Sequence, residues 1–191
     1  MSNDGMQWIA DVFDSYCLAL VRGLAVPELV QRMGADPAAV QQHVTGSEAF
    51  SMAMNEGPVS LLGTSEGWAF SLEHWSDQAA GAATLAEVSR GTEAVVLVNS
   101  GVGLMRFLHA VDGLVVADFE PGVSARDVDF AVAERLRPFA TDAYLFEVDG
   151  SPVMGEGDEE LWMLRFAEHV FGVALPREEL EHGALAAVLL A

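Results

Sequence analysis

Apolar residues near the start of the chain recur at intervals of three or four positions, which is the spacing of one face of a helix. The residues that set this spacing are Ile9, Val12, Phe13, Tyr16 and Leu20. The pattern predicts a helix from about Met6 to Val21, with Asp4 as a possible cap and Gly23 as a stop. Two shorter helices should follow, "PELVQRM" and a segment from Asp36 to about His43, while residues 45–57 best fit a further helical turn.

In the middle of the chain the period changes to that of strands. "VSLLGT" and "WAFSLEHW" are strand-length runs, and the second alternates apolar and small or polar residues. A short helix near 84–90 precedes three more apolar runs, "EAVVLVN", "LMRFLHAV" and "LVVADFE". The last two are separated by Asp112-Gly113, which favours a type I′ hairpin because both turn positions need positive φ.

The last third of the chain is predicted to be mainly helical, with helices near 127–137, 159–171 and 177–190. The fold class is therefore α+β, with about five mainly antiparallel strands flanked by N-terminal and C-terminal helices. We expect one domain over 1–191. It would have a helical part (1–57), an antiparallel sheet (58–121) and a mainly helical C-terminal part (122–191).

Charge narrows the range of functions. The chain has 29 acidic residues against nine basic ones, and all nine are arginine. Without lysine, phosphate-loop and Schiff-base chemistry are excluded. A net charge of −20 disfavours nucleic acid and anionic membranes and favours a basic protein partner. The single Cys17 excludes an internal disulfide, and no apolar run reaches the roughly 18 residues of a membrane span, so we expect a cytoplasmic protein.

Three segments imitate functional motifs. "GTSEG" around Ser65 matches the nucleophile elbow G-x-S-x-G, but a strand rather than a helix is predicted to follow, so Ser65 should lie at a hairpin tip. "SGVGLMRF" lacks the third glycine of a dinucleotide loop, and the acidic loop 149–160 has Met154 where a calcium loop needs glycine. We therefore predict no catalytic residue, no bound metal and no cofactor.

One group of polar residues, His109, Asp118 and Glu120, is a better candidate for a functional site. A two-residue turn at Asp112-Gly113 would place His109 opposite Val116 and Phe107 opposite Asp118. His109, Asp118 and Glu120 would then share one face of the sheet. A His–Asp pair of this kind can act as a general base or as half of a metal site, although it is more often a satisfied polar contact.

Several segments together resemble an uncharacterised, mainly actinobacterial family, the domain of unknown function 6461. The resemblance begins with "YCLALVRGLAVPELVQRMGAD" and continues through Gly67-Trp68 and Glu73. It extends over "LAEVSRGTEAV", "RFLHAVDG" and "FEP", and more loosely "AEHVFGVAL". It implies no activity, cofactor or site residue. After Glu73 this chain has His74-Trp75, where members often have a small polar turn.

Two functions from different classes remain. The first is a non-enzymatic acidic module, immunity-like or regulatory, that docks a basic protein through acids such as Glu156, Asp158, Glu159 and Glu160. The alternative is a small-ligand or metal-binding sensor, or an enzyme, that uses the face with His109, Asp118 and Glu120. A broad acidic surface with exposed aromatic residues would favour the first function, and a closed pocket around His109 would favour the second.

Overall fold

An eight-stranded antiparallel sheet forms the centre of the protein, in the order β2-β8-β3-β4-β1-β5-β6-β7. The computed structural model describes residues 5–121 and 159–190. The strands are β1 (Tyr16–Arg22), β2 (Gln41–Val44), β3 (Val59–Ser65), β4 (Trp68–His74), β5 (Glu93–Asn99), β6 (Met105–Val111), β7 (Leu114–Phe119) and β8 (Leu185–Leu189).

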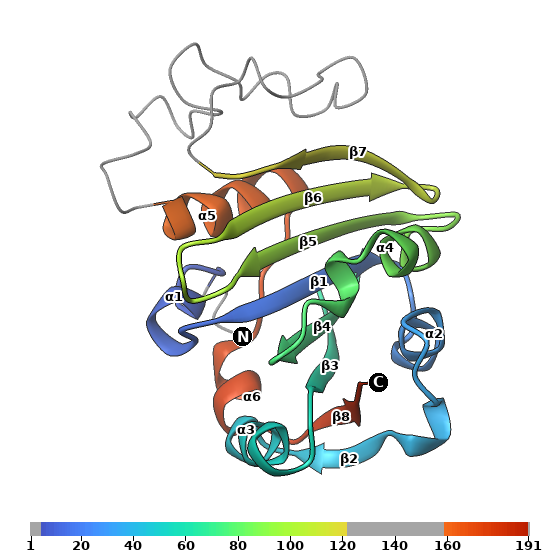
Figure 1. Cartoon of the computed structure of the whole chain (residues 1–191), viewed down its shortest axis with the longest axis vertical. Coiled ribbons are helices and arrows are strands. Elements are labelled where there is room, and N and C mark those ends of the chain that lie inside the picture. Colours follow the sequence, from blue (N-terminus) through green and yellow to red (C-terminus); the bar gives the residue numbers. More distant parts are fainter. Residues whose placement is uncertain (1–4, 122–158, 191) are drawn as a thin grey trace.

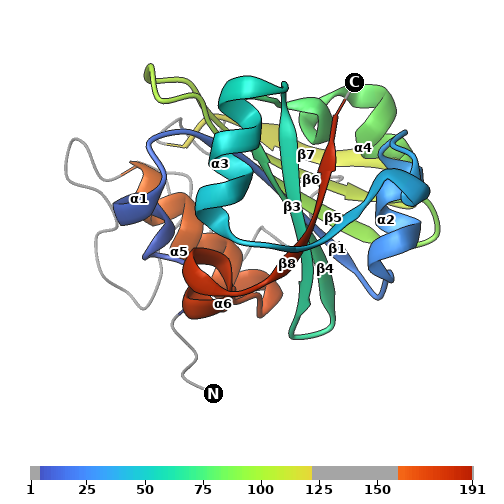
Figure 2. The same cartoon turned by 90° about the horizontal axis from the view of Figure 1, so that it is seen from below.

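Helices cover both faces of this sheet, so the architecture has three layers (Figures 1 and 2). One face carries α1 (Ile9–Val12), α3 (Gly46–Asn55), α5 (Glu159–Phe171) and α6 (Arg177–His182). The other carries α2 (Val26–Arg32) and α4 (Ala82–Val88), and the short 3-10 turns η1 (Pro37–Ala39) and η2 (Gln78–Ala80) complete the described elements. The predicted α+β class is confirmed, but the sheet has eight strands rather than about five.

Two hydrophobic clusters, one on each face, account for this layering. The first joins strand residues such as Leu18 and Phe70 to Ile9, Trp162 and Phe166 of the helices. The second joins the opposite sides of the same strands to α2 and α4. Because the sheet is buried on both faces, β1 and β5 are almost entirely apolar, and β4 is buried along its whole length although it contains Ser71 and Glu73.

The largest error of the sequence prediction is the helix over Met6–Val21. The structure has only the four-residue α1 in this region, and Tyr16–Arg22 is the central strand β1, paired with β4 and β5. Its first six residues are all buried, with Leu18 facing one cluster and Ala19 the other. A strand buried on both sides has no alternation to reveal it, and apolar spacing alone cannot distinguish it from a buried helix.

Some of the other predicted helices are present and some are not. The predictions near 27–33, 45–57, 84–90 and 159–171 agree with α2, α3, α4 and α5. The segment expected to be helical to about His43 contains only η1 followed by β2, and the helix predicted over 177–190 ends at His182 before β8. The helix predicted near 127–137 lies outside the described residues. No described helix has the length and apolar character needed to cross a bilayer.

Both predicted hairpins are present. Ser65 pairs with Trp68 across Glu66-Gly67, whose φ values of 50° and 81° give the doubly positive turn that closes a tight hairpin. A strand, not a helix, follows Gly67, so the prediction of a hairpin tip at Ser65 is confirmed and the nucleophile-elbow geometry is absent there.

Candidate functional site

The predicted cluster of His109, Asp118 and Glu120 does not share one face. The Asp112-Gly113 turn is present, with φ values of 48° and 80°, and Val111 pairs with Leu114. A register shift in β7 then places His109 opposite Ala117 rather than Val116. Because one extra residue moves all later side chains to the other face, the predicted grouping is wrong.

Asp118 instead faces Arg106 on the side of the sheet that carries α4. Its two carboxylate oxygens accept hydrogen bonds from Arg106 Nε at 2.7 Å and from Nη2 at 2.6 Å. This bidentate contact raises the pKa of Arg106 and occupies the carboxylate. Glu120 follows the end of β7 and is exposed.

His109 is buried on the opposite face and pairs with Glu93, which the sequence reasoning missed. Its Nε2 lies 3.0 Å from Glu93 Oε1, and the second carboxylate oxygen of Glu93 lies 3.1 Å from Arg22 Nε. Arg22 in turn lies over the ring of Trp68, 4.7 Å from its centroid. Glu93 could have been found from the register of β5 and β6, where Val95 pairs with His109. A ligand role for His109 stays a prediction.

Of the predicted partner-binding acids, Glu156 and Asp158 lie outside the described residues. Glu159 and Glu160 begin α5, where they are half-buried rather than fully exposed. Burial, followed by the neighbouring Glu160 carboxylate, raises the pKa of Tyr16 far above its ordinary value. Glu160 thus lies beside the core residue Tyr16, and the partner-binding role of these acids stays a prediction.

The structure reveals a cleft that the sequence reasoning did not identify. Its volume is about 650 Å³, and four segments distant in sequence meet around it, between α1, α3, α6 and the end of β4. The lining residues are Val12, Phe13, Asp14, Ser15, Gly46, Ser47, Phe50, His74, Trp75, Leu180, Glu181 and His182. We call this the His74 cleft.

His74 is the most buried polar side chain of the cleft, at 5% exposure. Its ring lies 5.8 Å from that of Phe13 and 6.3 Å, edge-on, from that of Phe50. Burial lowers its pKa, so the imidazole is neutral at neutral pH. Within the described part of the protein, its buried Nε2 has no hydrogen-bond partner, which costs about 1–3 kcal/mol relative to a satisfied group.

Trp75 lies at the rim of the cleft in a strained backbone conformation. Its φ of 61° is unusual for a large side chain, and its side chain is 56% exposed. Phe50 on the facing helix is also 52% exposed. Trp75 and Ser15 additionally line a second cleft of about 270 Å³ toward Asp77 and Leu104, so the two clefts adjoin across the tryptophan.

The loop that carries Trp75 is held by a buried acid on the other face of the sheet. Glu73, next to His74 in β4, is fully buried and accepts hydrogen bonds from the backbone N–H groups of Gln78 and Ala79 at 2.9 and 3.0 Å. Burial raises the pKa of Glu73 despite these donors. Its contacts fix η2 against the sheet and limit the freedom of residues 75–77.

The charges around the two clefts are of one sign. The described lining residues include the carboxylates of Asp14, Asp77 and Glu181 and no arginine. Asp14 and Asp77 are exposed, whereas Glu181 already pairs with Arg177 at 3.0 Å. The arrangement can bind an apolar or aromatic group together with a positive charge.

Comparison with known families gives a match over most of the chain. A model of a family of unknown function, DUF6461, matches residues 3–184. The chain belongs to the DUF6461 family. No curated protein and no solved structure matches it.

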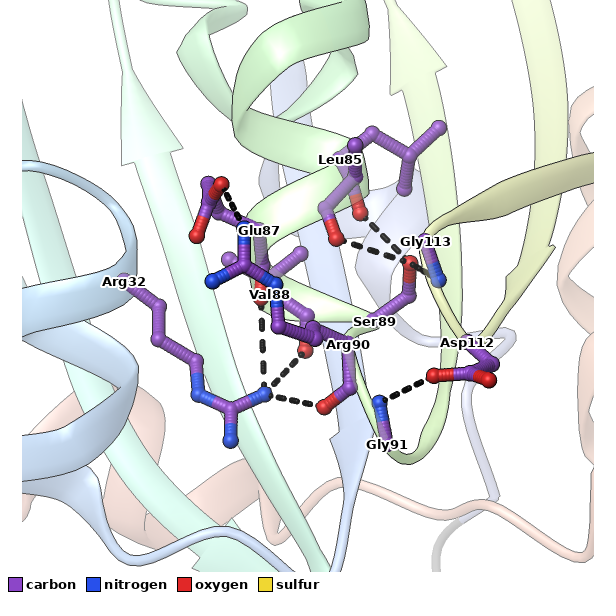
Figure 3. A network of polar contacts seen from close by, with 10 residues as sticks. Arg32, Leu85, Glu87, Val88, Ser89, Arg90, Gly91, Asp112 and Gly113 are labelled. Atoms are coloured by element: carbon purple, nitrogen blue, oxygen red, sulfur yellow. Dashed lines mark hydrogen bonds and ion pairs between the residues drawn. The ribbon is translucent and has the colours of Figure 1, made fainter.

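Parts of three segments that carry the DUF6461 resemblance, residues 16–36, 85–95 and 106–113, meet around Arg32, the end of α4 and the β6–β7 turn, away from the His74 cleft. Figure 3 shows the guanidinium of Arg32 directed at the C-terminal end of α4. There Nη1 donates to three backbone carbonyl oxygens, of which the Arg90 oxygen is nearest at 2.6 Å. Arg32 therefore satisfies carbonyls that the helix end leaves open.

The β6–β7 turn of this DUF6461 member joins the same network. Asp112 Oδ1 accepts a hydrogen bond from Gly91 N at 2.8 Å, and Gly113 N donates to Ser89 Oγ at 3.2 Å (Figure 3). Ser89 donates in turn to the carbonyl of Leu85 at 2.7 Å. These contacts are structural: they fix α4 and the hairpin, and leave the His74 cleft as the better candidate for binding.

Proposed function

We propose that this DUF6461 member is a non-enzymatic acidic module, immunity-like or regulatory, that docks a basic protein partner in the cytoplasm. The observation that carries the proposal is the His74 cleft, which combines exposed aromatic rings at Phe50 and Trp75 with carboxylates and has no arginine in its described lining. Protein interfaces are enriched in such aromatic residues.

Long-range electrostatics support the same partner. The net charge is −20, and five described arginines already form ion pairs with carboxylates of this chain. Most of the described arginines are therefore already paired within the chain, and a basic partner meets an attractive field. Such a field raises the association rate and is screened by salt, with a Debye length of about 8 Å at physiological ionic strength.

The groups most often used as nucleophiles give no support to an enzyme. Ser65 ends a strand at a hairpin, and Cys17 is buried, with burial raising the pKa of its thiol well above the ordinary value. A buried thiol of this kind carries little thiolate. The alternative of a sensor or enzyme built on His109, Asp118 and Glu120 loses its geometric basis, because the first two residues lie on opposite faces.

The proposal is tested by affinity capture from the source lysate at about 0.1 M and about 1 M salt, where the Debye length is about 10 Å and 3 Å. The wild type is compared with a Phe50→Ala/Trp75→Ala variant and with Leu114→Ala, which removes an exposed apolar side chain at the far hairpin. We expect a basic protein, identified by mass spectrometry, to be retained at low salt by the wild type and Leu114→Ala only. Retention of no basic protein, or equal retention by the cleft variant, overturns the proposal.

A further inference from the structure

The His74 cleft has the features of a site for one particular side chain. Phe50 and Trp75 are large aromatic residues on different elements; each is more than half exposed, and both line the same cleft. An exposed aromatic face attracts a cation through its ring quadrupole, and tryptophan does so most strongly. The negative charge of Asp14 and Asp77 on either side of Trp75 adds to that attraction.

An anionic ligand is disfavoured here. α3 begins at the cleft, but its N-terminus is already closed by a capping box. Glu48 Oε2 accepts from Thr45 N at 2.8 Å, and Glu48 N donates to Thr45 Oγ1 at 3.3 Å. The carboxylate of Glu48 therefore opposes the positive end of the helix, and an incoming anion would be repelled.

Arginine fits these surroundings better than lysine. A guanidinium is planar, stacks on aromatic rings, and carries donors at its edge for carboxylates, whereas an ammonium is a compact and strongly hydrated charge. The same fold already makes this contact twice. Arg22 lies 4.7 Å from the ring centroid of Trp68, and Arg177 lies 5.8 Å from that of Trp8.

A second, independent observation comes from His74. Its side chain lines the cleft and is only 5% exposed. Among the described residues, its Nε2 atom has no hydrogen-bond partner. A neutral imidazole can accept a hydrogen bond at a ring nitrogen, and a guanidinium has five N–H donors and no acceptor. The half-exposed Phe50 ring lies edge-on to His74 at the same cleft.

We infer that the His74 cleft binds an arginine side chain of the basic partner, with the guanidinium stacked on Trp75 beside Asp14 and a donated hydrogen bond to His74 Nε2. The inference rests on the proposed function, of which it names the recognised group. A volume of about 650 Å³ falls within the range of roughly 300–1,000 Å³ typical of ligand pockets. It therefore accommodates the arginine together with neighbouring atoms of its segment.

The test uses three short Gly/Ser peptides that are identical except for one central arginine, lysine or citrulline. Binding to the full chain is measured from ¹⁵N–¹H amide and tryptophan indole shifts during titration. We expect chemical-shift changes at Trp75, Phe50 and Asp14. Binding should be tightest for the arginine peptide and lost for the citrulline peptide, because citrulline keeps the shape of arginine without its charge. Trp75→Ala should weaken the arginine peptide by about 5- to 30-fold, while Leu114→Ala should leave its affinity unchanged.

Two further variants separate the contribution of the Asp14 charge from that of the His74 acceptor. Asp14→Asn should weaken the arginine peptide by several-fold, and the control Glu66→Gln, an exposed acid at the distant β3–β4 turn, should not. His74→Phe keeps an aromatic ring between Phe13 and Phe50 but removes the acceptor, so it should reduce the preference for arginine over lysine. Each variant's melting temperature is compared with the wild type to verify folding.

The outcomes distinguish this inference from the proposed function. Equal affinity for the arginine and lysine peptides, or no loss in Trp75→Ala, overturns the arginine site while a captured basic protein still supports docking by charge. If the peptides change chemical shifts only at residues away from the cleft, the arginine site is likewise overturned. Failure to retain any basic protein in the capture experiment refutes the proposed function itself.

Discussion

Replacing Gly46 with alanine should disturb the wall that α3 and α6 form around the His74 cleft. Gly46 is the first residue of α3, and a Cβ atom there would lie 2.6 Å from the backbone carbonyl oxygen of Leu180 and 3.5 Å from that of Glu181. Both neighbouring atoms belong to the backbone of α6, so neither can move by a simple side-chain rotation. The two helices must separate instead.

Two opposing effects set the change in the free energy of unfolding caused by Gly46→Ala. Inserting a methyl group into a packed contact costs about 1–3 kcal/mol. Alanine recovers up to about 1 kcal/mol of helix propensity relative to glycine in a helix interior, and less at a first position. The net expectation is a loss of about 1–2 kcal/mol in the free energy of unfolding. For a chain of this length that corresponds to a fall in Tm of about 2–8 °C.

Thermal unfolding followed by circular dichroism measures this change. Gly81→Ala is the control, because its Cβ would lie 3.1 Å from the carbonyl oxygen of Gln78 and away from the His74 cleft. It should lower Tm less than Gly46→Ala. If Gly46→Ala raises Tm or leaves it unchanged, helix propensity outweighs the contact, and the close approach of α3 to α6 is not the constraint that we describe.

Three other predictions concern the turns and the buried acid. Gly113→Val places a β-branched residue at a φ of 80° and should cost about 1–3 kcal/mol of stability; an unaltered urea midpoint would contradict this. Ser65→Ala should leave partner capture unchanged, and wild-type labelling by a fluorophosphonate that disappears in the variant would show a nucleophile after all. The folded-state pKa of Glu73 is raised, so its contribution to stability is present below the unfolded pKa and is lost as pH rises through the folded value. The Tm of the wild type minus that of Glu73→Gln should therefore fall with rising pH over that window, and parallel Tm profiles would refute the assignment.

His74 and Trp75 are neighbours in sequence but differ in exposure. At the end of β4 this chain has a buried imidazole, His74, followed by an exposed indole, Trp75. Both line the His74 cleft. The binding preference that we infer for the cleft depends on these two residues.

Local chemistry was enough to predict several elements from the sequence. The Glu66-Gly67 and Asp112-Gly113 turns have positive φ at both positions. Local sterics decide which residues adopt this conformation, so such turns can be predicted from a few neighbouring residues. The helix from Glu159 to Phe171 is likewise amphipathic by itself. Composition alone also established the excess of negative charge and the lack of lysine.

Tertiary structure decided the identity of β1 and the register of β7. Tyr16–Arg22 is apolar on both sides, so only its pairing with β4 and β5 makes it a strand. The register shift between His109 and Ala110 changes which residue of β7 lies opposite His109.

The His74 cleft depends on long-range contacts most of all. Asp14, Phe50, Trp75 and Glu181 lie on four segments spread over more than 160 positions of the chain, and each segment read alone shows an ordinary helix or strand end. The sequence by itself determined the charge, the turns and the best helices, because these depend on composition and on neighbouring residues. Which side chains face one another across the cleft was decided only by the folded chain, because strand order and helix placement bring distant residues together.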